Sequence, residues 1–294
     1  MNHVGVVFPQ TEIGADPGGV KAYVEAVEEA GYDHVVAYDH VLGADPAAHP
    51  EISGRAYTHR DQFHEPLVLF GYLAGICSLG LMTGILILPQ RQTALVAKQA
   101  AEVDILSGGR LRLGVGIGWN PVEYEALSES FRTRGRRMDE QVALLRRLWT
   151  EPVIDSFVGE RHRVTAAGIA PLPVQRPIPV WLGAAADERA LRRAGRLGDG
   201  WIPMARPGPD LDRAVALVRQ GAEEAGRDPS QIGMQARVEI GQGDHEELAS
   251  QALAWRKAGA THLAVNTMRA GFTSVDQHIA ALQAVAPSLG EAAP

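Results

Sequence analysis

The sequence contains one cysteine, Cys77, so no disulfide bond can form within the chain. Cys77 lies in an apolar helical context, which is typical of a core position. The amino terminus leads directly into an apolar segment and lacks the basic, apolar and small-residue succession of a secretory signal. The apolar run Leu81–Leu88 is too short to cross a bilayer. We therefore expect a protein of the reducing cytoplasm without a membrane partner.

Positive charge is also scarce. The chain has 28 lysines and arginines against 35 aspartates and glutamates, which gives a formal net charge of -7. Because nucleic-acid binding requires a basic face to neutralise phosphates, we expect no nucleic-acid partner. A small-molecule partner is the remaining expectation.

Several catalytic signatures are missing as well. The ten histidines form no His-Glu-x-x-His motif, so we predict no metal site. No Gly-x-Ser-x-Gly elbow and no paired strand-end carboxylates are present, which argues against a serine hydrolase and a glycosidase. We expect five histidines at the surface or in turns: His34, His49, His162, His245 and His278.

The stretch Leu81–Asn120 shows the organisation of the chain most clearly. Leu81–Leu88 is predicted to be a buried strand, Thr93–Leu106 a helix, and Arg110–Val115 a second buried strand. Continuously apolar strands joined by a helix are typical of a parallel sheet covered on both faces.

The same alternation runs through the whole chain. We count eight strand-then-helix units in 294 residues, the size of a (β/α)₈ barrel, and assign residues 1–294 to a single domain. Long segments follow the second strand, at Leu42–His64, and precede the fifth, at Glu151–Pro179. We interpret them as insertions, the first as a binding loop or lid and the second as an excursion that contains a hairpin.

Active sites of such barrels lie at the carboxyl ends of the strands. The residues that follow the predicted strands are rich in glycine, alanine and aromatic side chains and poor in nucleophiles, which favours a bound cofactor. Each group also has a structural interpretation. An Asp-His pair after a strand can satisfy backbone groups, the glycines of Gly114–Gly118 can permit packing, and Gly183–Ala186 can be an ordinary turn or an anion site.

Taken together, six segments resemble the luciferase-like monooxygenase superfamily, and most closely its coenzyme F420-dependent oxidoreductases. The segments are VVAYDH, DQFHEPLVLFGYLA, LMTGILILPQR, SGGRLRLGVGIGWNPVEYEALS, RGRRMDEQVALLRRLW and VWLGAAADERALRRAGRLGDGWIP. The likeness covers most of the chain through Pro203 and implies a (β/α)₈ barrel with a deazaflavin or flavin over its mouth.

The resemblance also implies roles for individual residues. Asp39 and His40 match a pair beside the ring, with His40 as a substrate contact or proton donor, and His64 with Glu65 is the second choice near substrate. The predicted catalytic residues are thus His40, Asp39 and His64. The resemblance further predicts a non-prolyl cis peptide bond at Gly84-Ile85.

Two backbone segments match those that receive the ribityl chain and the phosphate. The complete set of predicted cofactor-binding residues is Asp39, Thr83, Gly84, Ile85, Gly116, Ile117, Gly118, Trp119, Asn120, Gly183, Ala184, Ala185, Ala186 and Trp201. Trp119 stands where the sugar-phosphate dehydrogenases of this branch carry glutamate. This departure argues against sugar-phosphate oxidation and favours an apolar or aromatic pocket.

The resemblance predicts hydride transfer between coenzyme F420 and a small organic substrate, in the direction that reduces an unsaturated bond, within a homodimer. An FMN-dependent monooxygenase is the near alternative. A cofactor carrier without turnover and a metal-dependent hydrolase barrel are more distant ones. The cluster Arg132, Arg134, Arg136 and Arg137 favours F420, whose glutamate tail is anionic, although such a cluster is more often a solvated helix start than a ligand clamp.

Overall fold

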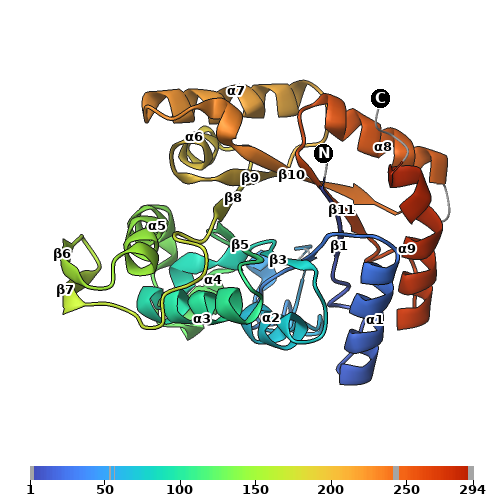
Figure 1. Ribbon diagram of the computed structural model, residues 1–294, viewed down its shortest axis with the longest axis horizontal. Helices are drawn as coiled ribbons and strands as arrows, with labels where there is room; N and C mark the ends of the chain where they lie inside the picture. Colours follow the sequence, from blue (N-terminus) through green and yellow to red (C-terminus); the bar gives the residue numbers. More distant parts are fainter. Residues whose placement is uncertain (1–2, 53, 56, 241–244, 291–294) are drawn as a thin grey trace.

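A computed structural model describes residues 3–52, 54–55, 57–240 and 245–290 (Figure 1). Parallel strands form a closed barrel in which β3 pairs with both β2 and β5, while β4 also pairs with β5. Since β3 and β4 are two parts of one strand position, the ring has eight positions, and the predicted (β/α)₈ barrel is confirmed. The barrel strands are β1 (His3–Val7), β2 (His34–Ala37), β3 (Gly80–Thr83), β4 (Leu86–Ile87), β5 (Leu111–Gly116), β8 (Val180–Ala184), β9 (Gly200–Pro203), β10 (Gly233–Glu239) and β11 (His262–Asn266).

Helices surround the barrel, as Figure 1 shows. Several begin where a side chain accepts hydrogen bonds from the free N–H groups of the first turn, as Asp16 does from Gly18 and Gly19. The α-helices of the described residues are α1 (Pro17–Glu29), α2 (Pro66–Ala74), α3 (Thr93–Leu106), α4 (Pro121–Ala126), α5 (Arg134–Thr150), α6 (Glu188–Leu197), α7 (Pro209–Glu224), α8 (His245–Lys257) and α9 (Val275–Gly290). Short 3₁₀ turns lie at Pro50–Ile52, Leu88–Gln90, Phe131–Thr133 and Pro229–Gln231.

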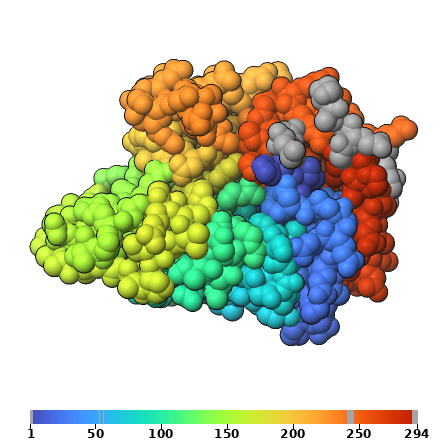
Figure 2. Space-filling model, viewed as in Figure 1, coloured from blue at the N-terminus to red at the C-terminus, as the bar shows by residue number. Residues whose placement is uncertain are grey.

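The two long segments predicted from the sequence differ in structure. Apart from residues 53 and 56, which lie outside the described part, 42–64 forms a loop with one 3₁₀ turn. The predicted hairpin within 151–179 is confirmed: β6 (Ile154–Val158) pairs antiparallel with β7 (Arg163–Ala167). Figure 2 shows this part of the chain protruding at one side of the body.

Apolar side chains pack on both faces of the strands. The larger core lies between strands and helices and contains Trp149, Tyr23 and Phe70. A smaller cluster of buried side chains packs on the other face of the strands. It consists of Val7, Val36, Met82, Trp181, Ala264 and Met268. This arrangement explains the continuously apolar strands, because each strand is covered twice. Cys77 is buried, as predicted.

The prediction of one unbroken strand at Leu81–Leu88 was wrong in detail. The segment is interrupted by a cis peptide bond at Gly84-Ile85, the position that the resemblance predicted. A Cβ atom at Gly84 would lie 2.3 Å from Cγ1 of Val36, so glycine is required where the chain turns past β2. The interruption places Gly84 and Ile85 at the barrel mouth.

The prediction for the histidines was wrong at two positions. His34 and His278 are fully buried, at 1% and 0% exposure. His34 is bound by Asp33, and His278 by Thr267. A neighbouring polar group makes burial of an imidazole tolerable, and the sequence alone did not show these partners. The side chain of His245 lies outside the described residues.

Candidate active site at the barrel mouth

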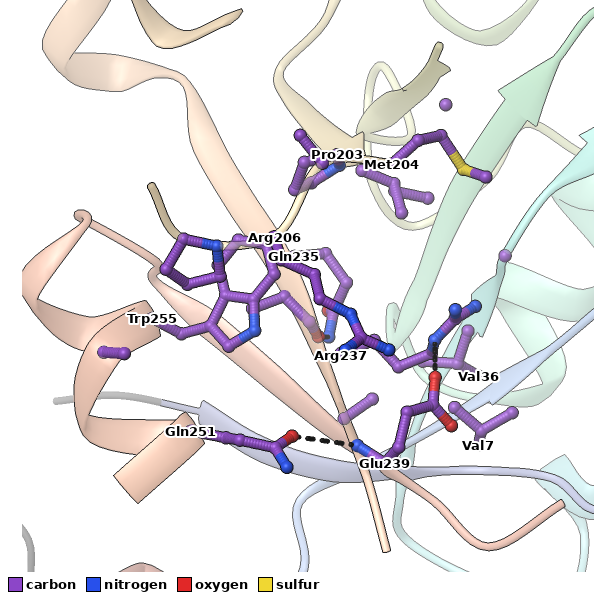
Figure 3. A pocket seen from close by; sticks show the side chains of 18 of the residues that line it. Val7, Val36, Pro203, Met204, Arg206, Gln235, Arg237, Glu239, Gln251 and Trp255 are labelled. Atoms are coloured by element: carbon purple, nitrogen blue, oxygen red, sulfur yellow. Dashed lines mark hydrogen bonds and ion pairs between the residues drawn. The ribbon is translucent and has the colours of Figure 1, made fainter. Parts of the chain in front are cut away.

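A cavity of about 430 Å³ lies at the carboxyl ends of the strands (Figure 3). It is lined by Val7 of β1, Val36 of β2, and Ala264 of β11, together with Gly84 and Ile85 at the interruption between β3 and β4. Residues of β8, β9, β10 and α8 complete the wall: Gly183, Ile202, Pro203, Gln235, Arg237, Glu239, Gln251 and Trp255. The lining combines apolar surface with a few polar groups, as cofactor and substrate sites usually do.

Strand β10 supplies the polar wall of this cavity. Its residues alternate between apolar Met234, Ala236 and Val238, which belong to the core, and polar Gln235, Arg237 and Glu239, which line the cavity with Ala236. The three polar side chains can be followed in Figure 3. Sequence reasoning missed these three residues. The alternation in MQARVE was the available signal, because polar residues at every second position of an otherwise buried strand indicate a face toward a site.

Arg237 organises this wall. Its Nη1 donates to the Tyr38 hydroxyl at 3.0 Å, and its Nε lies 2.6 Å from Oε1 of Glu239. Burial raises the pKa of Tyr38 to about 12, although the positive charge of Arg237 acts in the opposite direction. Tyr38 is therefore a neutral hydrogen-bonding group at physiological pH.

Gln235 presents an unused acceptor. The side chain is 3% exposed, and its Nε2 donates to the carbonyl oxygen of Ala236 at 3.2 Å. Its Oε1 has no hydrogen-bond partner among the described residues. Since buried polar atoms are normally paired, this oxygen is suited to accept a hydrogen bond from a bound ligand.

The side chain of Ile85 packs between two of the predicted cofactor-binding glycines. A Cβ atom at Gly116 would lie 2.6 Å from Cδ1 of Ile85, and one at Gly183 would lie 2.9 Å from its Cγ2. Gly114 faces Thr83 in the same way, since its Cβ would lie 1.9 Å from the Thr83 carbonyl oxygen. The geometry at Gly114 and Gly116 agrees with the packing interpretation, and Gly116 and Gly183 together leave room for the Ile85 side chain at the cavity.

Asp39 holds the chain in place directly after the interruption at Gly84-Ile85. Its Oδ2 accepts from the backbone N–H of Ile87 at 2.9 Å, and its Oδ1 lies 2.7 Å from Nη2 of Arg91. Arg91 also pairs with Glu65, through Nη1 and Oε1 at 2.8 Å. Burial raises the pKa of Asp39, and the Arg91 charge opposes that shift. Both carboxylate oxygens are therefore occupied by the protein.

His40 lies in a second hollow of about 360 Å³, lined also by Tyr57, Phe63 and Asp61. The rings of Tyr57, Phe63 and Trp119 have centroids within 5.6 Å of the imidazole centroid. The aromatic environment that Trp119 predicted is therefore present around His40. The His40 side chain is 10% exposed, and its Nδ1 lies 3.4 Å from Oε2 of the fully buried Glu123.

The other predicted residues are spread over several places. His64 donates from Nε2 to the carbonyl oxygen of Gly14 at 3.1 Å and lines a separate surface hollow beside α1 and α2.

Thr83 is buried and donates to the Gly114 carbonyl oxygen at 2.6 Å. Asn120 caps α4 through Val122, and the backbone oxygen of Ile117 accepts from Tyr124. Gly118 has φ 60°, which favours glycine.

A third hollow, of about 480 Å³, lies at the turn before α6. It is lined by Ala184, Ala185, Ala186 and Trp201, with Arg213 as its basic side chain. The Asp187 carboxylate accepts from the N–H of Ala190 at 3.0 Å and so caps α6. The predicted phosphate segment is thus an open turn at a helix start whose first turn is already partly capped.

The described residues contain no group of three or more His, Cys, Asp or Glu side chains arranged to hold a metal ion. Among the same residues, every helix is too short or too polar to span a lipid bilayer.

The arrangement of barrel, interrupted third strand and mouth cavity can be compared with known proteins. The model of the family described as luciferase-like monooxygenase matches residues 3–288. The chain belongs to this family. It is 32% identical over 262 residues to an F420-dependent hydroxymycolic acid dehydrogenase of Mycobacterium tuberculosis, covering 87% of this chain and 68% of that protein.

Solved structures share the fold at low sequence identity. An F420-dependent secondary alcohol dehydrogenase in complex with an F420-acetone adduct has a TM-score of 0.79 at 19% identity, covering 98% of this chain and 99% of that one. The FMN-bound oxygenating constituent of 3,6-diketocamphane monooxygenase from Pseudomonas putida has a TM-score of 0.75 at 13% identity, covering 100% and 99%. These likenesses establish the barrel as the family fold.

Proposed function

We propose that the protein is a coenzyme F420-dependent oxidoreductase that transfers a hydride between the deazaflavin and a small organic substrate. The observation that carries the proposal is the mouth cavity, whose lining includes Gly84, Ile85 and Gln235, the last with a buried oxygen that has no partner among the described residues. The 32% identity to an F420-dependent dehydrogenase supports the same choice of cofactor.

The residues present fit such a cofactor. A tricyclic ring needs apolar surface and a few polar partners, and Val7, Val36 and Ala264 with Ile85 supply the former. Gln235 would accept a hydrogen bond from a ring N–H. The turn Gly183–Ala186 would receive the phosphate, because backbone N–H groups at a helix start favour anions. When bound, the deazaflavin supplies hydride chemistry, and the protein supplies orientation and proton transfer.

His40 would exchange the proton that accompanies the hydride. An imidazole titrates near neutrality and can act as general acid or base. In the proposed direction, His40 would donate its proton to the substrate atom next to the one that is reduced. His40 would then take up a new proton from water. Oxidation of an alcohol is the same sequence in reverse, with His40 as base.

The rings of Tyr57, Phe63 and Trp119 would exclude water around His40 and favour an apolar substrate. Asp39 would act indirectly, because its contacts with Arg91 and Ile87 hold the end of the third strand in place. His64 has the weakest support among the proposed catalytic residues, because its Nε2 is engaged by the Gly14 carbonyl oxygen.

The test is binding of the purified protein to oxidised coenzyme F420 and, separately, to FMN, followed by fluorescence. Preferential binding of F420 is expected, and multiple-turnover reduction of an unsaturated compound by reduced F420 would follow from it. Binding of neither cofactor would overturn the proposal.

An FMN-dependent monooxygenase is the second candidate, favoured by the shared fold of the FMN-bound camphane monooxygenase constituent. Preferential FMN binding with oxygen-dependent substrate oxidation would replace the first proposal by this one. Binding of F420 without any turnover would instead indicate a carrier protein. The single domain, the homodimer and the cytoplasmic location stay predictions.

A further inference from the structure

A buried carboxylate lies behind the imidazole of His40. Glu123, in the first turn of α4, is 0% exposed and was not among the residues that the sequence singled out. A buried carboxylate is costly unless it is paired or hydrogen-bonded, so the partners of its two oxygens define its role.

One oxygen fixes the backbone beside His40. Oε1 of Glu123 accepts from the backbone N–H of Val41 and also from that of Leu42, at 3.3 Å for the latter. These are the two residues that follow His40 in the chain. The position of Glu123 relative to the His40 backbone is therefore set by hydrogen bonds that do not involve the imidazole.

The other oxygen faces the ring. Oε2 accepts no hydrogen bond within the described part of the chain, and Nδ1 of His40 lies 3.4 Å from it. Hydrogen bonds at catalytic sites are often long before substrate binds and then shorten. The ion pairs of the described residues give Glu123 one basic partner, the His40 imidazole.

Other charged groups around His40 have partners of their own. Asp39 is held by Arg91 and Ile87. Asp61, which lines the same hollow, accepts from the backbone N–H and hydroxyl of Thr58 at 2.7 and 3.1 Å. His59 lies 3.8 Å from Asp45, and Tyr57 is the remaining titratable group of that hollow.

We propose that Glu123 is the positioning residue for His40: its Oε2 accepts the Nδ1–H of the ring and leaves Nε2 as the nitrogen that exchanges a proton with substrate. This inference rests on the proposed role of His40 as general acid. A carboxylate in this position selects one neutral tautomer and stabilises the protonated ring electrostatically.

The decisive variant is Glu123→Gln. The glutamine carbonyl oxygen can still accept the hydrogen bonds from the N–H groups of Val41 and Leu42. In that orientation the glutamine NH₂ group faces Nδ1 of His40. An amide donor at Nδ1 requires that nitrogen to be the acceptor. We therefore expect the neutral ring to change from the Nδ1–H to the Nε2–H tautomer.

Nitrogen NMR of protein labelled with ¹⁵N-histidine measures this directly, with the His40 signals assigned by their loss in His40→Asn. The wild type should show the Nδ1–H tautomer, and Glu123→Gln the Nε2–H tautomer. Glu125→Gln is the matched control, since Glu125 lies on the same helix and is exposed. It should leave the spectrum unchanged.

A wild-type Nε2–H tautomer, or an unchanged tautomer in folded Glu123→Gln, would overturn the proposal. The wild-type measurement needs no Glu123 variant, so it tests the proposal even if Glu123→Gln fails to fold. Neither measurement depends on F420 or substrate, so a failure of the proposed function leaves the tautomer result intact.

With an active substrate, kcat of Glu123→Gln should fall about tenfold or more. The basic limb of its pH profile should move to lower pH, because the protonated ring loses its anionic partner. A lower kcat with an unmoved pH profile would indicate a merely structural role and count against the proposal.

Discussion

Nη2 of Arg91 lies 2.7 Å from Oδ1 of Asp39, in a pair whose side chains are 13% and 1% exposed. The contact joins the end of the second strand position to the segment after the third. Since Asp39 also holds Ile87, the pair fixes the chain directly after the Gly84-Ile85 interruption. The geometry of the cavity therefore depends on a salt bridge outside its lining.

Removing Arg91 should be strongly destabilising. Arg91→Met leaves the buried Asp39 without its cation, and we expect the free energy of unfolding to fall by about 3 kcal/mol. Urea denaturation followed by circular dichroism measures this. Arg192→Met is the control: Arg192 pairs at the surface with Glu188 and Glu224, so its loss should leave the free energy of unfolding nearly unchanged. Equal losses in both variants would contradict the role assigned to Arg91.

His40 should matter for turnover and not for cofactor affinity. His40→Ala removes the proposed proton donor, so we expect kcat to fall about 10²-fold or more. Its side chain lines the second hollow and is not among the residues that line the cavity proposed for the ring, so F420 binding measured by fluorescence should be nearly unchanged. His49→Ala, at a half-buried histidine paired with Glu51 outside the site, should retain wild-type rates. Full activity of His40→Ala would remove His40 from the mechanism.

Gly116 should be sensitive because of Ile85. The methyl group of Gly116→Ala would lie 2.6 Å from Cδ1 of Ile85, so the isoleucine must move, and it borders the cavity. We expect cofactor affinity to fall about tenfold, equivalent to about 1.4 kcal/mol. The double variant Gly116→Ala/Ile85→Val lacks Cδ1 and should recover most of the affinity. If it binds as weakly as Gly116→Ala alone, contact with Ile85 is not the cause.

Stability should decrease in mild acid because of His34. Burial lowers the pKa of His34 to about 4 from 6.5, although the hydrogen bond with Asp33 opposes the shift. Between these values the unfolded chain binds a proton that the folded chain does not, so the unfolding free energy falls as pH falls through this window. For His34 alone the loss reaches about 3 kcal/mol near pH 4.

Urea denaturation at a series of pH values between about 7 and 4 tests this expectation. His34→Gln should make the dependence less steep whatever its effect at neutral pH, because one titrating imidazole is gone. Burial also lowers the pKa of His278 and of His262, so these two residues keep part of the acid sensitivity. His49→Gln, at a half-buried position, should keep the wild-type slope. An unchanged slope in His34→Gln would show that other groups carry the acid sensitivity.

The sequence predicted the fold more completely than it predicted the residues of the candidate site. Apolar runs such as Arg110–Val115 and helix stops such as Gly108 are local signals, and they identified the units of the barrel. The interruption at Gly84-Ile85 was predicted from a resemblance, and periodicity alone gave an unbroken strand. Gln235 and Arg237 were missed because Gly233–Ile240 was treated only as one more strand of the barrel, and the alternation of polar residues in MQARVE was not used.

The sequence by itself determined the order of strands and helices, their parallel arrangement and the end of the barrel at which chemistry is expected, because these follow from periodicity and chain direction. Only the tertiary structure decided which side chains meet. Glu123 lies behind His40, Arg91 reaches Asp39, and Ile85 packs against Gly116 and Gly183. Each contact joins positions far apart in the chain, so it depends on the closure and register of the barrel.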